Sequence, residues 1–180
     1  LWAAIFAALL GSVVSQGFKE ILDIPRPAGI LDLADFRVIG EAHKKYAYPS
    51  GHTLTVFTLA GAILPFLQRA GMQAALLAVV TLAGLSRIMV GVHWPADVLA
   101  GAGLGLLCGL GGLAIARRWP AGLRPKVHIT LAALFTAAAA ALFWRDGGYP
   151  AAIWLARATA LAALASAGLW YWYPLLRRGA

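Results

Sequence analysis

The residues best suited to chemistry lie in residues 86–97, a short stretch between two long apolar segments that contains Arg87, His93 and Asp97. Ionisable groups at the edge of a membrane-like segment are costly to desolvate, so they are usually paired or functional. Pro95 is favoured at the first position of a helix, which places His93 just before a helix N-terminus. Asp97 follows four residues later and is close enough to hydrogen-bond one imidazole nitrogen. The other nitrogen is then free to act as a nucleophile, and Arg87 can hold an anion beside it.

Two earlier polar clusters are predicted to lie on the same membrane face as this stretch. They are Lys19 with Arg26-Pro27, and Pro49-Ser50-Gly51-His52. Taken separately, each cluster has a structural explanation, as loop charges, as a helix start capped by Ser50, or as an internal hydrogen bond. Together the clusters supply three cations, two histidines, one carboxylate and a helix N-terminus, which suits a phosphoryl group during its transfer. No Asp and His residues stand at metal-ligand spacing, so we expect a site without metal or cofactor.

The motifs that these residues form resemble a known signature. Lys19-x6-Arg26-Pro27, Pro49-Ser50-Gly51-His52 and Ser86-Arg87-x5-His93-x3-Asp97 are similar to the three-part signature of the type 2 phosphatidic acid phosphatase superfamily. That superfamily includes membrane lipid phosphatases and soluble vanadium haloperoxidases. All three parts are present, in order, and the resemblance covers residues 2–116. The two helices that usually precede the first motif are missing, so the chain reads as N-terminally truncated.

The resemblance implies a role for each matched residue. His93 would attack phosphorus to form a phosphohistidine, Asp97 would orient its ring, and His52 would protonate the leaving oxygen and later activate water. The groups that would bind the phosphoryl oxygens are Lys19, Arg26, Arg87, the Ser50 hydroxyl and the Gly51 backbone N–H. General chemistry agrees, because an imidazole suits both half-reactions and a glycine lets the backbone approach an anion closely.

The composition is that of an integral membrane protein. Of 180 residues, 61% are hydrophobic and 12% are charged. Six apolar segments are predicted to cross the bilayer as helices, giving an all-α bundle: residues 2–17, 50–67, 72–90, 95–116, 127–144 and 151–173. Leu1 is not preceded by a start methionine or a signal peptide, which again indicates a piece of a longer chain. We expect a phosphatase core in residues 1–116, followed in residues 117–180 by a basic loop and two further transmembrane helices.

The net charge of +8 is distributed by side of the membrane rather than gathered in one patch for nucleic acid. If the segments alternate across the bilayer, one face has only basic loop residues: Arg69, Arg117, Arg118, Arg124, Lys126, Arg177 and Arg178. The other face has the motifs and all seven acidic residues, with Arg145 and Asp146 in its last loop. The positive-inside rule predicts that the first face is cytoplasmic. The motifs would then face the periplasm or cell exterior of a bacterial cytoplasmic (inner) membrane.

Several residues with potential for chemistry are given structural roles instead. Gly101, Gly105 and Gly109 form a small-residue stripe, for which packing inside the bundle is favoured over dimerisation. Cys108 is a small packing residue. His43 and His128 have no partner that the sequence identifies, and Arg157, inside the last segment, is expected to snorkel towards the motif face or to pair within the bundle. The tryptophans lie mostly near segment ends, which is typical of an interfacial belt.

The sequence therefore predicts a metal-independent membrane lipid phosphatase. Its partners would be membrane lipids and a lipid phosphate or diphosphate substrate, such as undecaprenyl diphosphate, phosphatidylglycerol phosphate, phosphatidic acid or lipid A. Three alternatives remain: transfer of the phosphohistidine to another lipid or sugar, a haloperoxidase holding vanadate at the same residues, and a non-catalytic membrane protein.

Overall fold

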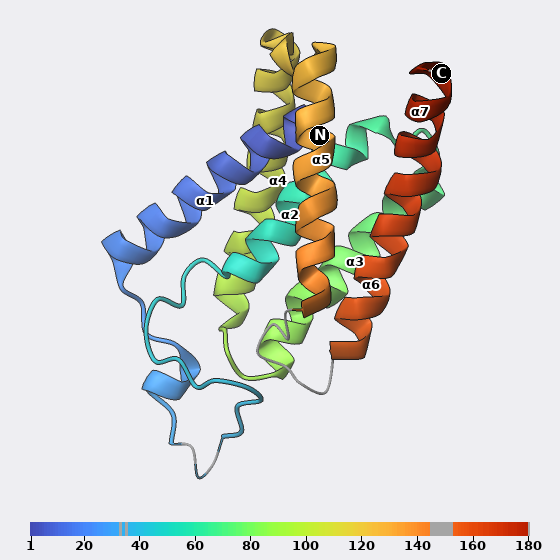
Figure 1. Cartoon of the computed structure of the whole chain (residues 1–180). Helices are drawn as coiled ribbons and strands as arrows, with labels where there is room; N and C mark the ends of the chain where they lie inside the picture. The colour runs from blue at the N-terminus through green and yellow to red at the C-terminus, as the bar shows by residue number, and fades with distance from the viewer. Residues whose placement is uncertain (33, 35, 145–152, 180) are drawn as a thin grey trace. The chain divides into compact units, whose positions relative to one another are not determined.

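A computed structural model describes residues 1–32, 34, 36–144 and 153–179. These residues form helices and connecting loops, with no strand among them (Figure 1). They divide into two compact units, Leu1–Gly122 and Leu123–Ala180. The first unit has four α-helices: α1 (Trp2–Leu22), α2 (Gly51–Ile63), α3 (Ala70–Met89) and α4 (Pro95–Arg118). Short helical turns add η1 (Pro27–Gly29), η2 (Leu64–Phe66) and η3 (Pro120–Leu123).

The helices confirm an all-α integral membrane protein. Among the described residues, five helical segments are long and apolar enough to cross a bilayer. The sixth expected segment is the shorter pair α2 and η2, interrupted near Pro65. Large apolar side chains such as Leu9, Val13 and Leu82 are exposed on the helices of the first unit, as a lipid environment allows.

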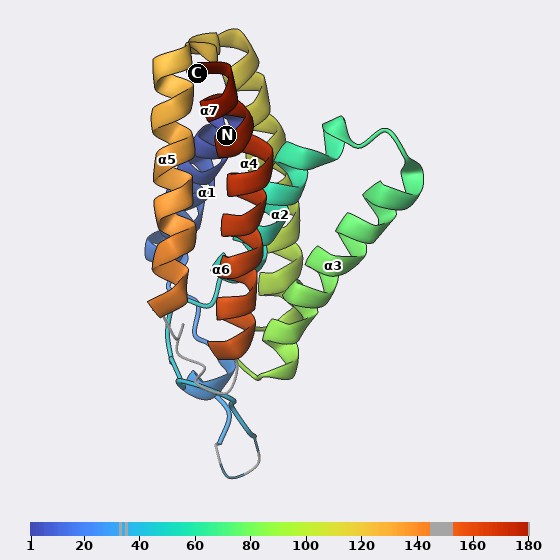
Figure 2. The same cartoon turned by 45° about the vertical axis from the view of Figure 1, so that its right-hand side comes forward.

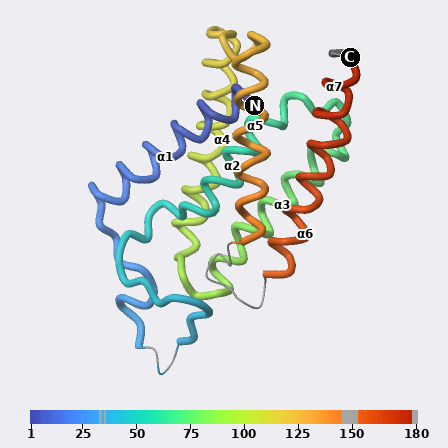
Figure 3. Tube along the Cα trace, in the orientation of Figure 1, coloured from blue at the N-terminus to red at the C-terminus, as the bar shows by residue number. Residues whose placement is uncertain are grey.

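Helix α4 is the central element of the first unit. The Trp2 indole N–H donates a 2.6 Å hydrogen bond to the Trp119 carbonyl, so α1 begins where α4 ends and runs antiparallel to it. Helix α2 lies along α4 in the same direction, and the tube trace shows both helices rising together from the loop end of the unit (Figure 3). Helix α3 returns from η2 to the start of α4 (Figure 2).

The glycine stripe explains why α2 and α4 pack so closely. A Cβ atom on Gly101 would lie 2.8 Å from the Ser50 carbonyl oxygen, and one on Gly105 would lie 2.5 Å from that of Leu54. A Cβ on Gly109 would collide with the Thr58 carbonyl. The stripe therefore packs inside the bundle, as the sequence predicted, and fixes the spacing and register of the two helices.

Some predicted helix ends were wrong by one to several residues. Helix α1 continues to Leu22 and so includes Lys19, which the sequence placed at the start of a loop. It ends at Asp23, whose backbone adopts the left-handed conformation with φ 38°. Helix α3 begins at Ala70, two residues before the predicted segment 72–90, and α4 extends to Arg118, two residues beyond the predicted 95–116.

The second unit contains α5 (Pro125–Ala141), η4 (Leu142–Trp144), α6 (Ile153–Ala167), the π-helical turn η6 (Gly168–Trp172) and α7 (Tyr173–Gly179). Arg157 pairs within this unit, since its Nε donates to the Phe143 carbonyl at 3.4 Å and its guanidinium lies 5.5 Å from the Phe143 ring centroid. The His128 ring packs 5.5 Å from that of Tyr171. The predicted loop at Arg145 and Asp146 lies outside the described residues.

Candidate active site

The helix directions of the first unit bring all eight predicted site residues to one end of it. The C-terminal ends of α1 and α3 contribute Lys19 and Arg87. The first turns of α2 and α4, with the residues just before them, contribute five more groups. Those groups are Ser50, Gly51, His52, His93 and Asp97, and Arg26 lies in the loop between α1 and η1. Helix N-termini carry partial positive charge, so both helix starts add to an environment that favours an anion.

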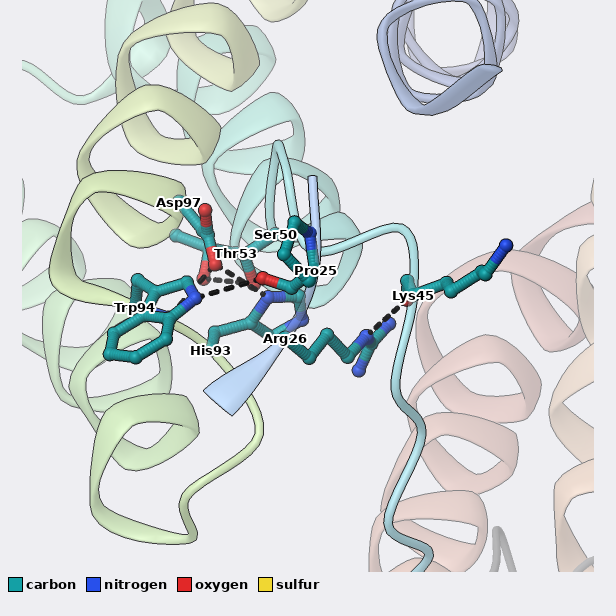
Figure 4. A network of polar contacts seen from close by, with 8 residues as sticks. All are labelled: Pro25, Arg26, Lys45, Ser50, Thr53, His93, Trp94 and Asp97. Carbon is teal, nitrogen blue, oxygen red and sulfur yellow. Dashed lines mark hydrogen bonds and ion pairs between the residues drawn. The ribbon is translucent and has the colours of Figure 1, made fainter. Parts of the chain in front are cut away.

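His93 and Asp97 form a buried contact at the start of α4. The Asp97 Oδ2 atom lies 3.3 Å from His93 Nδ1, and only 3% and 2% of the two residues are exposed. The same oxygen accepts a 2.8 Å hydrogen bond from the Trp94 backbone N–H, which fixes the carboxylate at the helix start. With Nδ1 directed at the carboxylate, the second imidazole nitrogen, Nε2, is the one left for a substrate (Figure 4).

Ser50 connects the second motif to the third. Its backbone N–H donates to the Asp97 carbonyl at 3.0 Å, and its fully buried side chain accepts a 3.0 Å hydrogen bond from the Thr53 hydroxyl. Ser50 occupies the N-cap position of α2, as predicted, although its side chain makes no capping hydrogen bond. The sequence missed Thr53, which reads as one more polar residue in an apolar helix.

Trp94 connects the first motif to the third. Its indole N–H donates to the Pro25 carbonyl at 2.9 Å, directly beside Arg26 (Figure 4). The sequence assigned Trp94 to an interfacial belt, and only its place between His93 and Asp97 hinted at anything else. The structure gives its indole a hydrogen-bonding partner 69 residues away.

The three predicted phosphate-binding cations are held in different ways. The Arg26 Nε donates to the Lys45 carbonyl at 3.0 Å, and the Arg26 backbone N–H donates to the Lys44 carbonyl at 2.9 Å. The Arg87 Nε lies 3.4 Å from the Ser86 hydroxyl. The Lys19 ammonium lies beside the start of α2, 3.4 Å from where a Cβ on Gly51 would stand.

His52 lies outside the five spanning segments, at the first turn of α2, and its side chain meets these charges. Partial desolvation and the neighbouring positive charges lower the pKa of the His52 imidazole. The charges come from Arg87, His93, Arg26 and Lys19. A bound phosphate would offset them, so the tendency of His52 to hold a proton depends on whether the site contains an anion.

Within the part of the chain that the structure describes, no group of three or more His, Cys, Asp or Glu side chains is arranged to hold a metal ion. The arrangement instead combines one oriented imidazole, a second imidazole and two helix N-termini with three cations from neighbouring segments. Such a set can bind a phosphoryl group, attack it and exchange a proton with the oxygen that leaves.

Comparison with known proteins gives the evolutionary context. Residues 1–121 match the family model of the PAP2 superfamily. The chain belongs to the PAP2 superfamily. The matched residues include all eight predicted site residues and nearly the whole first unit, which confirms the resemblance stated from the motifs.

Among PAP2-like proteins of known structure, the chain is similar to Aquifex aeolicus LpxE, with a TM-score of 0.55 and 32% sequence identity. The match covers 63% of this chain and 66% of LpxE. The chain is also 40% identical to the lipid A 1-phosphatase of Porphyromonas gingivalis, over 35% of this chain and 15% of that protein. The chain is 29% identical to the lipid A 1-phosphatase of Rhizobium johnstonii, over 56% of this chain and 41% of that protein.

A further match is the bacitracin transport permease protein BcrC of Bacillus licheniformis. It is 42% identical over 36% of this chain and 30% of BcrC. The matched segments thus span less than half the length of each of these curated relatives.

Proposed function

We propose that this PAP2 protein is a metal-independent membrane lipid phosphatase that removes a terminal phosphate through a phosphohistidine intermediate. The observation that carries the proposal is the buried contact between His93 Nδ1 and Asp97 Oδ2 at 3.3 Å. This contact orients one imidazole at the point where the cations of three motifs meet. The other nitrogen of that ring is then a nucleophile with a fixed direction.

In the first half-reaction, the lone pair of His93 Nε2 attacks phosphorus and the bond from phosphorus to the lipid oxygen breaks. The His52 imidazolium donates its proton to that oxygen, so the lipid leaves as a neutral hydroxyl or a protonated phosphate. Asp97 stabilises the positive charge that develops on His93. Lys19, Arg26 and Arg87 neutralise the phosphoryl oxygens while charge builds up on them.

In the second half-reaction, the oxygen of a water molecule attacks the phosphohistidine while neutral His52 takes a proton from that water. The phosphorus–nitrogen bond breaks, inorganic phosphate leaves, and His93 regains its lone pair. His52 ends the cycle protonated, ready to act again as an acid. The same residue thus serves both steps, as microscopic reversibility favours for a single imidazole near the leaving oxygen.

The membrane helices and the relatives support a lipid substrate. A site at the end of apolar helices meets head groups whose chains remain in the hydrocarbon, and two relatives are named lipid A 1-phosphatases. In this proposal the site lies at the periplasmic face of the bacterial inner membrane, an orientation that the positive-inside rule favours from the charge asymmetry of the loops.

The test is phosphate release by the chain in detergent from lipid phosphates and diphosphates, in the presence of EDTA. We expect EDTA-resistant release by wild type and none by His93→Ala. Quenching turnover with SDS at alkaline pH should trap ³²P on wild-type protein in an alkali-stable form that acid then releases, as a phosphohistidine requires. Release that EDTA abolishes, or that His93→Ala retains, would refute the proposal.

A further inference from the structure

Beside the proposed phosphate site lies a cavity of about 650 Å³ that the proposed mechanism does not use. Its walls come from the last turns of α1, from Arg26 and from the returning part of the long loop. The lining residues are Gln16, Lys19, Glu20, Arg26, His43, Lys44, Lys45 and Tyr46. This volume lies in the range of cavities that bind small ligands or head groups.

The returning part of the loop is held in a fixed position by main-chain groups. The Lys44 carbonyl accepts the Arg26 backbone N–H at 2.9 Å, and the Lys45 carbonyl accepts the Arg26 side chain at 3.0 Å. Gly29 permits this approach, because a Cβ there would lie 2.5 Å from the Lys44 carbonyl oxygen. The backbones of the two lysines are therefore held at a fixed place relative to Arg26, and Figure 4 shows the bond from Arg26 to Lys45.

The cavity has an excess of positive charge. Its lining includes four cationic side chains, Lys19, Arg26, Lys44 and Lys45, and one carboxylate, that of Glu20. Outside the lining, the Asp23 carboxylate lies 3.7 Å from the Lys45 ammonium. Over the described residues, the Lys44 ammonium has no carboxylate within ion-pair distance. Two of the four cations are assigned to the scissile phosphate. Lys44 therefore provides the main charge for a second anion, and Lys45, which is shared with Asp23, lies next to it in the chain.

The location of the cavity indicates which part of a substrate would enter it. Lys19 lines the cavity, and its ammonium also lies beside Gly51, the residue before His52. His52 is the proposed acid for the leaving oxygen, so the leaving group would extend from the side of His52. A leaving group that continues past Lys19 enters the cavity.

We propose that Lys44 and Lys45 bind a second phosphate, carried by the leaving group of the substrate. This inference rests on the proposed function and deepens it. It predicts selectivity for lipid diphosphates, or for lipids whose terminal phosphate is linked to a phosphodiester, over lipids such as phosphatidic acid, whose leaving group is uncharged.

The experiment compares wild type with the double variant Lys44→Ala/Lys45→Ala, in which the backbone carbonyls that bind Arg26 are kept. The matched control is Arg117→Ala/Arg118→Ala, which removes two exposed cations from the other end of α4. The substrates are two matched pairs in one detergent: farnesyl diphosphate with farnesyl phosphate, and phosphatidylglycerol phosphate with phosphatidic acid of the same acyl chains. The quantity measured is the ratio of kcat/KM within each pair.

We expect the lysine variant to lower the ratio by about 5-fold, the effect of losing one or two exposed charge pairs, and the control variant to leave it unchanged. A fall in the farnesyl pair alone would assign the cavity to a directly bonded second phosphate. A fall in the phosphatidyl pair alone would assign it to a phosphate separated by glycerol. An unchanged ratio in both pairs would overturn the inference.

A binding measurement separates this inference from the proposed function. Methylenediphosphonate, which is not hydrolysed, and methylphosphonate are titrated into wild type and the lysine variant. Preference for the diphosphonate in wild type, reduced in the variant, supports the second-phosphate site even if no turnover is found. Equal preference in both proteins refutes it. The proposed function is tested separately, by phosphate release in EDTA and by His93→Ala.

Discussion

The spacing of α2 and α4 gives the sharpest prediction about geometry, through the substitution Gly105→Ala. The added Cβ would lie 2.5 Å from the Leu54 carbonyl oxygen and 2.8 Å from the Phe57 Cβ. An ordinary contact needs about 3.5 Å, so the helices must separate by about 1 Å. Helix α2 carries His52, and the start of α4 carries His93, so this separation moves the proposed acid away from the proposed nucleophile.

A displacement of about 1 Å at a catalytic group can lower the rate roughly 100-fold. We therefore expect Gly105→Ala to lower kcat for phosphate release by about that factor. The control is Gly103→Ala on the same helix, where an added Cβ meets nothing within 4 Å. It should keep wild-type kcat and gain about 1 kcal/mol of helix propensity.

The assay is initial-rate phosphate release at saturating lipid, with thermal unfolding followed by tryptophan fluorescence to confirm that both variants are folded. Wild-type kcat in a folded Gly105→Ala protein would refute the argument that close packing of α2 on α4 sets the distance between the two imidazoles. Equal losses in both glycine variants would refute it as well, because Gly103 lacks the contact.

Three further predictions concern single side chains. Asp97→Asn keeps the shape of the carboxylate but removes its charge, so kcat should fall about 1,000-fold with the helix intact by circular dichroism; a loss under 10-fold would exclude Asp97 as the group that orients His93. Lys19→Met removes a cation that lowers the pKa of His52. That pKa should rise, so the alkaline fall of kcat/KM, where the acid loses its proton, should move to higher pH; an unchanged or lower midpoint would contradict the assignment. Trp94→Phe deletes the hydrogen bond to Pro25, worth about 1 kcal/mol. It should raise KM several-fold by loosening the Arg26 segment. Trp119→Phe should leave KM unchanged, because its ring is exposed apart from stacking on Phe6 and its hydrogen bond from Trp2 is accepted by the backbone carbonyl, which phenylalanine keeps.

Features set by local chemistry were predictable from the sequence. Pro95 starts α4, and the four-residue spacing of His93 and Asp97 brings their side chains together on one helix start. The glycine stripe on α4 also predicted close packing, because small residues at four-residue intervals share one helix face. Each of these depends on residues fewer than nine positions apart.

Features that depend on distant contacts were not predictable in the same way. The bond from Trp94 to Pro25 spans 69 residues, and no periodicity connects the two. The end of α1 was misplaced because the charged residues Lys19 and Glu20 follow Gly17 closely, although the backbone stays helical to Leu22. No partner for His43 could be identified from the sequence, since only the folded loop brings it to the same cavity as Lys19.

The long loop is fastened at its base by hydrogen bonds to backbone carbonyls, with the Arg26 and Trp94 side chains among the donors. The Ala47 N–H donates to the Ile24 carbonyl at 2.8 Å, next to the pairing of Arg26 with Lys44. Main-chain bonds of this kind tolerate most side chains, apart from proline as a donor and any residue larger than glycine at position 29, where a Cβ would lie 2.5 Å from the Lys44 carbonyl oxygen. Substitutions along the loop can therefore change the charge presented to a head group while the helices beneath keep their positions. If the loop binds the leaving group as proposed, substitutions in this surface segment would alter the substrate range while the reacting groups keep their positions.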